Sequence, residues 1–159
     1  MNRSNLAVAT ALALTTGGLF AAELARADHR PVTRGEFHEF AVGASSGMDI
    51  GGDARMIRTG GGRTLVRIKV TGLDPGIEYA SHVHAAPCGV GEADGHYMHV
   101  PGGGTTPPNE IWPGPITADR HGVARGDTVA DFVAGEAAVS VVVHRPGPTP
   151  NKIACADLE

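Results

Sequence analysis

Basic residues are too few in this sequence to suggest binding to nucleic acid. The chain has 13 Lys and Arg residues against 17 Asp and Glu residues, which gives a formal net charge of −4 at pH 7. Broad nucleic-acid binding needs a basic face, because the phosphates supply most of the attraction. Long stretches with the 3.6-residue period of an amphipathic helix are also missing. The chain is therefore not expected to bind nucleic acid or to consist of long helices.

Apolar runs as long as the roughly 20 residues of a membrane-spanning helix are missing too. The apolar stretch 6–22 is interrupted by Thr and Gly, follows the basic Arg3 and precedes the small-x-small site Ala25-Arg26-Ala27. This pattern predicts a secretory signal peptide over 1–27, cleaved after Ala27, and a secreted, periplasmic or cell-envelope location. A membrane anchor is the alternative, but no stop-transfer pattern follows, so the mature chain is not expected to enter a membrane.

Cysteine is scarce, and the two that occur are Cys88 and Cys155. In an exported protein a lone pair usually forms one disulfide, whereas two free thiols that bind a metal are the alternative. The enclosed loop is long, so the chain-entropy model assigns such a bridge about 4 kcal/mol of stability.

Turn residues and short alternating runs are abundant, with 23 Gly and 11 Pro scattered along the chain. They predict one all-β domain, a sandwich or barrel. The clearest strand is Thr64–Thr71, in which Val66, Ile68 and Val70 share one face. A core over 64–159 is expected, with 28–63 adding an N-terminal strand and a Gly-rich loop. The other expected strands are 35–42, 77–85, 116–119, 123–128 and 138–144, with a weak one near 54–58; the expected loops are 43–62, 87–113 and 145–152.

Four of the eight histidines stand out by position. His82 and His84 lie two apart in an expected strand, so both imidazoles point to one face. His144 ends an apolar run, and His96 lies in the long loop 87–113. Taken singly, they are typical of surface, core and solvated loop histidines. Together they form a four-nitrogen set that suits Cu(II) and also zinc. A bridge between the two cysteines would tie the two ends of this set together.

The order and spacing of these residues resemble the copper/zinc superoxide dismutase family, exported bacterial type. The family's signature is a His-x-His strand, a nearby Cys, a Gly-His pair, a Val-Val-His strand and a late Ala-Cys. The resemblance covers roughly 64–158, including a central segment similar to Val-Thr-Ala-Asp-x-x-Gly-Val-Ala at 116–124. The matching residues here are Ser81-His82-Val83-His84, Cys88, Gly95-His96-Tyr97, Val142-Val143-His144 and Ala154-Cys155.

The resemblance implies a Greek-key β-barrel or sandwich with a metal on its outer face. It implies a disulfide between Cys88 and Cys155 and an enzyme that dismutates the superoxide anion. The dimer contacts of the family vary, so a homodimer is left open. The copper ligands that it implies are His82, His84, His96 and His144, with His96 as the imidazole that bridges copper to zinc in the family.

The sequence departs from the family pattern in three ways, of which the missing zinc ligands and the shortened loop resemble copper-only members. The family's zinc ligands are two further histidines and an aspartate, whereas residues 100–113 contain neither His nor Asp, so zinc binding is doubtful. A weak second site built from His96, His99 and Glu110 is the remaining possibility. Lys152 replaces an active-site Arg, which keeps the positive charge but loses the planar fork. The loop between His144 and the last Cys is also shorter than the family's charged steering loop.

Catalytic roles follow from the resemblance for two residues. His96 would return a proton to the peroxide product, and Lys152 would supply local positive charge for an anionic substrate. Without zinc another acceptor must orient His96; Glu110 is the candidate, and a solvated loop carboxylate is the alternative. His99 is a second candidate for a place beside the ligands.

Two other functions compete with the enzyme. A non-catalytic copper carrier or buffer would keep the ligands without turnover, and a structural β-sandwich would bind no metal. The complete set of four histidines argues against the structural protein. The sequence does not separate the enzyme from the carrier.

Overall fold

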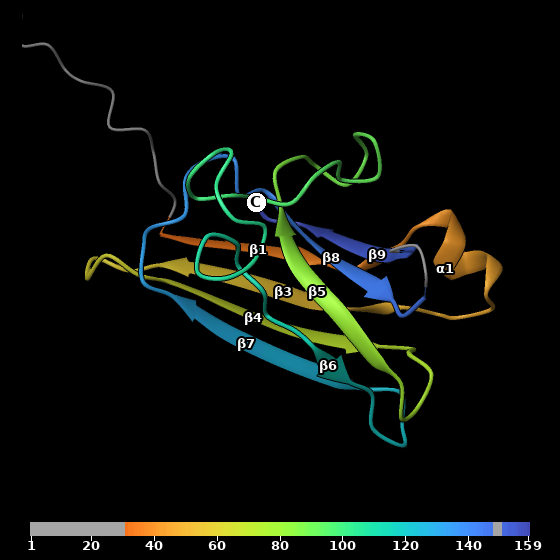
Figure 1. Cartoon of the computed structure of the whole chain (residues 1–159). Helices are drawn as coiled ribbons and strands as arrows, with labels where there is room; N and C mark the ends of the chain where they lie inside the picture. Colours follow the sequence, from red (N-terminus) through yellow and green to blue (C-terminus); the bar gives the residue numbers. More distant parts are fainter. Residues whose placement is uncertain (1–30, 148–150) are drawn as a thin grey trace, which may run out of the picture.

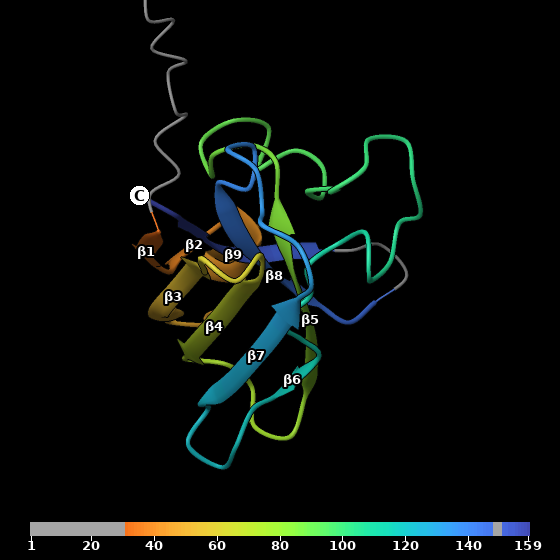
Figure 2. The same cartoon turned by 90° about the vertical axis from the view of Figure 1, so that its left-hand side faces the viewer.

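Two antiparallel sheets pack face to face in this protein (Figure 1; Figure 2). A computed structural model of the chain describes residues 31–147 and 151–159. The expected signal peptide 1–27 and its cleavage site after Ala27 lie outside the described residues.

The strand order places partners that are distant in sequence beside one another. One sheet has the order β1-β3-β4-β7 and the other β2-β9-β8-β5-β6. The pairs β4–β7 and β5–β8 are typical of Greek-key connections, so the expected Greek-key β-sandwich is confirmed. The elements are β1 (Val32–Glu36), β2 (His38–Glu39), α1 (Ala41–Ser45), β3 (Gly51–Arg58), β4 (Thr64–Thr71), β5 (Glu78–His84), β6 (Ile116–Thr117), β7 (Ala124–Ala130), β8 (Ser140–Arg145) and β9 (Asn151–Asp157).

The core lies between the two sheets and is built from alternate residues of their strands. β4 has the bounds expected from its alternation, and Val66, Ile68 and Val70 are buried while Arg67 and Lys69 are exposed. Aliphatic side chains of β8 and β5, among them Val141, Val143 and Val83, complete this core from the other sheet. Because successive side chains point to opposite faces, the residues between them lie on the outer face of that sheet.

The expected single strand over 35–42 is wrong. The chain changes sheets at the buried Phe37: β1 pairs with β3, whereas β2 pairs with β9 and leads into α1. The short helix passes so close to β9 that a Cβ at Gly43 would collide with the carbonyl oxygen of Ile153. Alternation in the sequence continues through such a crossover, so it gives no sign of the change.

Two strands differ from what the sequence predicts. In the expected loop 43–62, the weak strand expected near 54–58 is the second half of the eight-residue β3, whose two glycines and one aspartate have low strand propensity. β3 forms because β1 and β4 supply backbone partners on both edges. The expected loop 145–152 runs into β9, which lies between β2 and β8. Residues 153–156 are all buried, so this strand has no apolar–polar alternation to reveal it.

The long segment after β5 is irregular, as expected, but backbone bonds fix it against β5. The Val83 N–H donates to the carbonyl of Ile111 at 2.9 Å, and the Val83 carbonyl accepts from the N–H of Tyr97 at 2.9 Å. The N–H of Ala85 donates to the carbonyl of Gly95 at 3.0 Å. The segment is therefore anchored at two places, near 95–97 and at Ile111, to the strand that carries His82 and His84.

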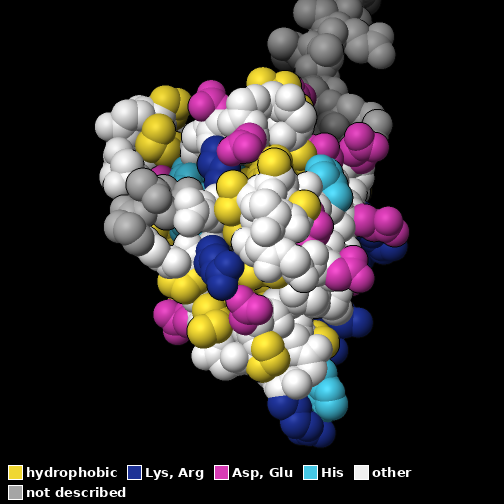
Figure 3. Space-filling model, turned by 90° about the vertical axis from the view of Figure 1, so that its right-hand side faces the viewer, with side chains coloured by type: hydrophobic (Ala, Val, Ile, Leu, Met, Phe, Trp, Pro, Cys, Tyr) yellow, Lys and Arg dark blue, Asp and Glu magenta, His cyan; other side chains and the backbone are white. Residues whose placement is uncertain are grey.

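Charges of both signs are spread over the face seen in Figure 3 rather than gathered into one basic surface. Among residues 31–147 and 151–159, no helix is both long and apolar enough to cross a membrane.

The two cysteines form the expected disulfide, with their Cα atoms 5.8 Å apart. Cys88 follows β5 and Cys155 lies in β9, so the bridge fastens the loop to the sheet. A second small apolar cluster surrounds it on the outer face of the sheet, made up of Phe40, Cys88, Ala93, Val142 and Cys155.

Replacing both cysteines by serine should lower the free energy of unfolding by about 4 kcal/mol, because the bridge closes a loop of 67 residues. Urea unfolding of the metal-free variant against the oxidised parent measures the difference. Reducing agent should weaken the parent by a similar amount and leave the variant unchanged. An equal unfolding midpoint for parent and variant would contradict the prediction.

Candidate metal centre

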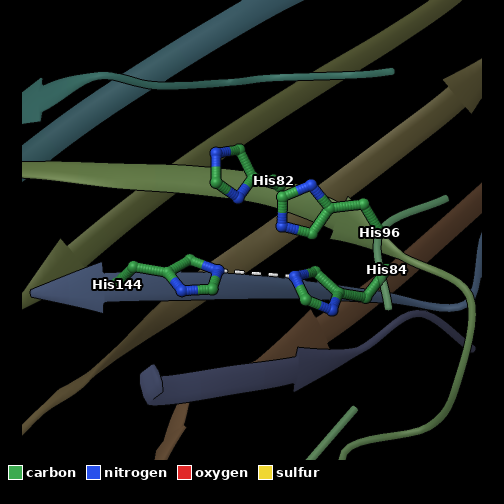
Figure 4. A group of neighbouring side chains, drawn as sticks. All are labelled: His82, His84, His96 and His144. Atoms are coloured by element: carbon green, nitrogen blue, oxygen red, sulfur yellow. Dashed lines mark hydrogen bonds between the residues drawn. The ribbon is translucent and has the colours of Figure 1, made fainter. Parts of the chain in front are cut away.

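Four imidazoles converge on the outer face of the five-stranded sheet. One ring nitrogen from each of them lies within 4.8 Å of those of the others. Figure 4 shows the four rings turned toward a common space, two of them from β5, one from β8 and one from the loop. The group consists of the four histidines singled out in the sequence, His82, His84, His96 and His144.

The pairing of β5 with β8 brings three of these rings together. His82 lies opposite Val142 in the register, and His144 lies opposite Ala80, so the two histidines are diagonal neighbours on one face. Their ring centroids are 4.8 Å apart. His84 stands on the same face of β5, and its Nε2 is 3.4 Å from Nε2 of His144. A sequence separation of 60 residues is closed here by strand register alone.

His96 enters the group from the loop. A single bridge pairs its backbone with that of His84, and this places the His96 ring centroid 4.8 Å from that of His84 and 4.2 Å from that of His82. Its side chain is 32% exposed, whereas His84 and His144 are almost completely buried. The group is therefore open to solvent on the His96 side.

A left-handed turn fixes the orientation of His84. Residues 91–94 all have positive φ, although three of them, Glu92, Ala93 and Asp94, are not glycine. Each such L-residue costs about 1–2 kcal/mol, so the surrounding contacts must hold the turn in place. The turn aims the carbonyls of Ala93 and Asp94 at Nδ1 of His84, at 3.1 and 3.2 Å. Because carbonyls only accept, Nδ1 carries the proton and Nε2 faces the group.

Lys152 holds the same turn from the other side. Its Nζ donates to the carbonyls of Glu92 and Asp94 at 2.8 and 2.7 Å. An irregularity in the β8–β9 pairing sets Lys152 opposite His144, as bulges beside functional sites often do. The structure therefore brings the ammonium group of Lys152 next to the histidines. Two of its hydrogen bonds go to backbone carbonyls of the turn.

A buried carboxylate lies behind His96. Oε2 of Glu110 accepts a hydrogen bond from Nδ1 of His96 at 2.8 Å and another from the indole N–H of Trp112 at 2.7 Å. The Glu110 side chain is 2% exposed, so it is not the solvated loop carboxylate that was the alternative. With its Nδ1 donating, His96 turns Nε2 toward the other rings.

Other residues considered from the sequence lie outside the four-histidine group. The His99 ring stacks on Phe132 with centroids 3.9 Å apart. The sequence did not reveal the functional part of the turn 91–94 or of the donor Trp112.

The turn could not be recognised from its side chains because it acts through its carbonyls. The two-residue spacing of Glu110 and Trp112, in contrast, indicated that they share one side of an extended segment.

Solved structures with a similar fold are known. The clock protein EA4 matches with a TM-score of 0.58 and 19% identity, over 80% of this chain and 93% of that chain. Two single-residue variants of superoxide dismutase 5 from Candida albicans each match with a TM-score of 0.55 over 80% of this chain. They are 17% and 16% identical, and 90% and 88% of their lengths are covered.

The chain has the superoxide dismutase fold. No protein-family model matches the sequence, and no curated protein matches it either. At these identities the likeness speaks for the fold alone, so the chemistry has to be argued from the residues.

The donor set fits a metal ion. Metal–nitrogen bonds are about 2 Å long, so two nitrogens on opposite sides of an ion lie about 4 Å apart. The ring nitrogens of the four histidines lie within 4.8 Å of one another, which is close to that separation. The Nδ1 atom of His82 is buried without a hydrogen-bond partner, an arrangement that costs free energy unless something satisfies it. Imidazole ligands suit copper and zinc, and a four-nitrogen set in tetragonal geometry is typical of Cu(II).

Burial keeps the imidazoles of His82, His84 and His144 neutral. It lowers the pKa of His82 and of His84 to about 4 and that of His144 to about 3. Repulsion from neighbouring imidazolium charges lowers the pKa of His82 and His144 further. At neutral pH their lone pairs are therefore free for a metal, and no proton has to be displaced first.

Without metal, the protein should lose stability as the pH falls from 7 to 5. Unfolded histidines take up protons near pH 6.5, whereas the folded His82, His84 and His144 resist until about pH 4 or 3. The unfolded state then binds more protons in this window, so acid favours unfolding. Urea unfolding of the metal-free protein at several pH values measures the slope.

The decrease in the free energy of unfolding between pH 7 and 5 should become smaller in His82→Gln. It should stay the same in His121→Gln, because His121 lies in an exposed turn. Stability of the metal-free parent that does not change between pH 7 and 5 would contradict the assignment of neutral histidines.

Proposed function

We propose that this protein is a copper-dependent superoxide dismutase that acts outside the cytoplasm. The observation that carries the proposal is the convergence of four imidazole nitrogens within 4.8 Å on the outer face of a superoxide dismutase fold. The ligands would be His82, His84, His96 and His144. Superoxide anion would be the substrate, and O₂ and H₂O₂ the products.

Copper bound there would supply one-electron chemistry, in which one superoxide is oxidised to O₂ and a second, with two protons, is reduced to H₂O₂. The chain's own residues would orient the ligands and deliver charge. His84 is held by the carbonyls of the turn 91–94, and the burial of His144 excludes water from its side of the site.

His96 would carry the proton. Its side chain is 32% exposed, whereas His84 and His144 are buried, so a small substrate would reach the site from the His96 side. Its Nδ1 is tied to Glu110, so the proton that moves would be held at Nε2, the atom that faces the other rings. Glu110 keeps the ring in place while that proton is taken up and released.

Within 31–147 and 151–159, zinc has no comparable set of histidine and carboxylate donors. Residues 100–113 contain no His and no Asp, and Glu110 is already engaged by His96 and Trp112. His99 stacks on Phe132, away from the four-histidine group. The role that zinc has in the family, to hold the bridging imidazole, would pass to the Glu110 carboxylate, and we propose a copper-only enzyme.

An extracytoplasmic location is supported by the disulfide, because such bonds persist in oxidising compartments. The signal-peptide pattern in 1–27 agrees with it. A copper carrier without turnover remains the second candidate function, since Lys152 spends hydrogen bonds on the turn 91–94 and stands where the family has Arg.

Copper loading tests the site and the activity separately. The copper-loaded protein should give an axial Cu(II) paramagnetic resonance signal with nitrogen hyperfine structure and should consume superoxide, whereas zinc loading should give no turnover. His144→Ala should lose both the signal and at least ten-fold in activity, about 1.4 kcal/mol in the barrier. His121→Ala is the matched control and should keep both.

Three outcomes are informative. A parent that shows the copper signal but no turnover would favour the carrier over the enzyme. A parent that takes up no copper would overturn both. Circular dichroism of His144→Ala separates loss of the ligand from loss of the fold.

Lys152→Met should reduce kcat/KM and flatten its dependence on salt, because a cation beside His144 attracts the anionic substrate. Lys69→Met is the matched control: it removes the same charge from an exposed position of the other sheet and should change neither. Lys152→Arg, which keeps the charge, should restore the salt dependence. An equal response of the two Met variants would contradict a steering role for Lys152.

A further inference from the structure

We infer that Trp112 is a positioning residue of the metal centre, which sets the electron donation of His96 through the carboxylate of Glu110. This inference rests on the proposed function, in that it takes the four histidines as copper ligands. The juxtaposition that carries it is one carboxylate oxygen shared between an indole N–H and the ring N–H of His96.

The two hydrogen bonds meet at a single atom. Oε2 of Glu110 is 2.8 Å from Nδ1 of His96 and 2.7 Å from Nε1 of Trp112. Indole N–H is a donor only, and a carboxylate only accepts when ionised, so the direction of the second bond is fixed. A carboxylate that is 2% exposed has little water to complete its hydrogen bonds, so the two donors carry most of its stabilisation.

Sharing one oxygen couples the two donors. The hydrogen bond from Trp112 draws electron density of the Glu110 carboxylate toward the indole N–H, and this weakens the hydrogen bond that the same oxygen accepts from His96. Removing the indole donor would leave more charge on the bond to His96 and would make its Nε2 a stronger electron donor. A stronger donor stabilises the oxidised form of a bound metal, so its reduction potential falls.

Trp112 also contacts the other side of the group. Its ring centroid lies 4.9 Å from that of His82, and the His82 centroid lies 4.2 Å from that of His96. The indole therefore contacts both His82 on β5 and Glu110, the residue that holds His96. Between them, the buried Ile111 accepts a backbone bond from Val83, which anchors the segment to β5.

Local backbone geometry explains why Glu110 and Trp112 act as a pair. Ile111 points into the core and is 1% exposed, so its two neighbours along the extended segment point the other way, toward the histidines. The separation of two residues thus puts an acceptor and a donor on one side of the chain. The chain contains no other Trp.

The test is the Trp112→Phe variant, which removes the N–H and keeps an aromatic ring against His82. In the copper-loaded protein its Cu(II)/Cu(I) potential should shift to a lower value, and its Cu(II) paramagnetic resonance parameters should change. A redox titration followed by paramagnetic resonance measures both, and neither readout depends on turnover.

A double-mutant cycle separates action through the carboxylate from general packing. If Trp112 works through Glu110, Trp112→Phe should shift the potential much less in an E110Q background than in the parent. Tyr97→Phe is the matched control: Tyr97 lies in the same loop as Trp112, and its hydroxyl accepts a hydrogen bond from the N–H of Gly135 at 2.8 Å rather than contacting Glu110. It should leave the potential unchanged.

The outcomes distinguish the inference from the proposed function. Unchanged potential and spectrum in Trp112→Phe, or an equal shift in the E110Q background, would overturn the positioning role even if the parent dismutates superoxide. If the parent binds copper without turnover, the proposed enzyme activity is refuted. A potential shift in Trp112→Phe that disappears in the E110Q background would still support the positioning role of Trp112.

Discussion

The pairing of β5 with β8 is the constraint on which the rest of the site depends. It sets His82 and His84 beside His144 on the outer face of a sheet whose inner face is filled by Val83, Val141 and Val143. A slip of one residue would turn the histidines into the core and the valines out to solvent, so the apolar core itself enforces the register. The free energy that stabilises the sandwich thereby fixes three imidazoles in space.

The remaining parts of the site are held by contacts that water cannot easily replace. The disulfide and the small cluster around it fasten the loop to β9, and backbone bonds of Tyr97 and Ile111 with Val83 anchor it to β5. Carbonyls of the left-handed turn 91–94 orient His84, and a buried carboxylate orients His96. Burial lowers the pKa of His84 and of His144, so these two imidazoles are neutral at neutral pH and their lone pairs are available.

Sequence patterns predicted best where one signal dominated. Alternation gave the bounds of β4, and the spacing of histidines and cysteines, read through a family resemblance, indicated the four-histidine group and the disulfide. Prediction was only partial at β3, where a weak strand near 54–58 was expected, and failed at β9; the Gly, Ala and Asp residues of these strands have weak strand propensity. Both are central strands with a partner on each edge, so long-range pairing decides their conformation, and single-sequence patterns carry no record of it.

The sequence by itself determined which atoms are available: eight histidines, two cysteines, and no His or Asp in 100–113. Only the tertiary structure decided which of those histidines meet, that a carboxylate and an indole stand behind one of them, and that Lys152 bonds to a turn 58 to 60 residues away. The physical reason is that residue type fixes what a side chain can donate or accept, whereas its partners are set by strand register and loop anchoring, which are properties of the whole packed chain.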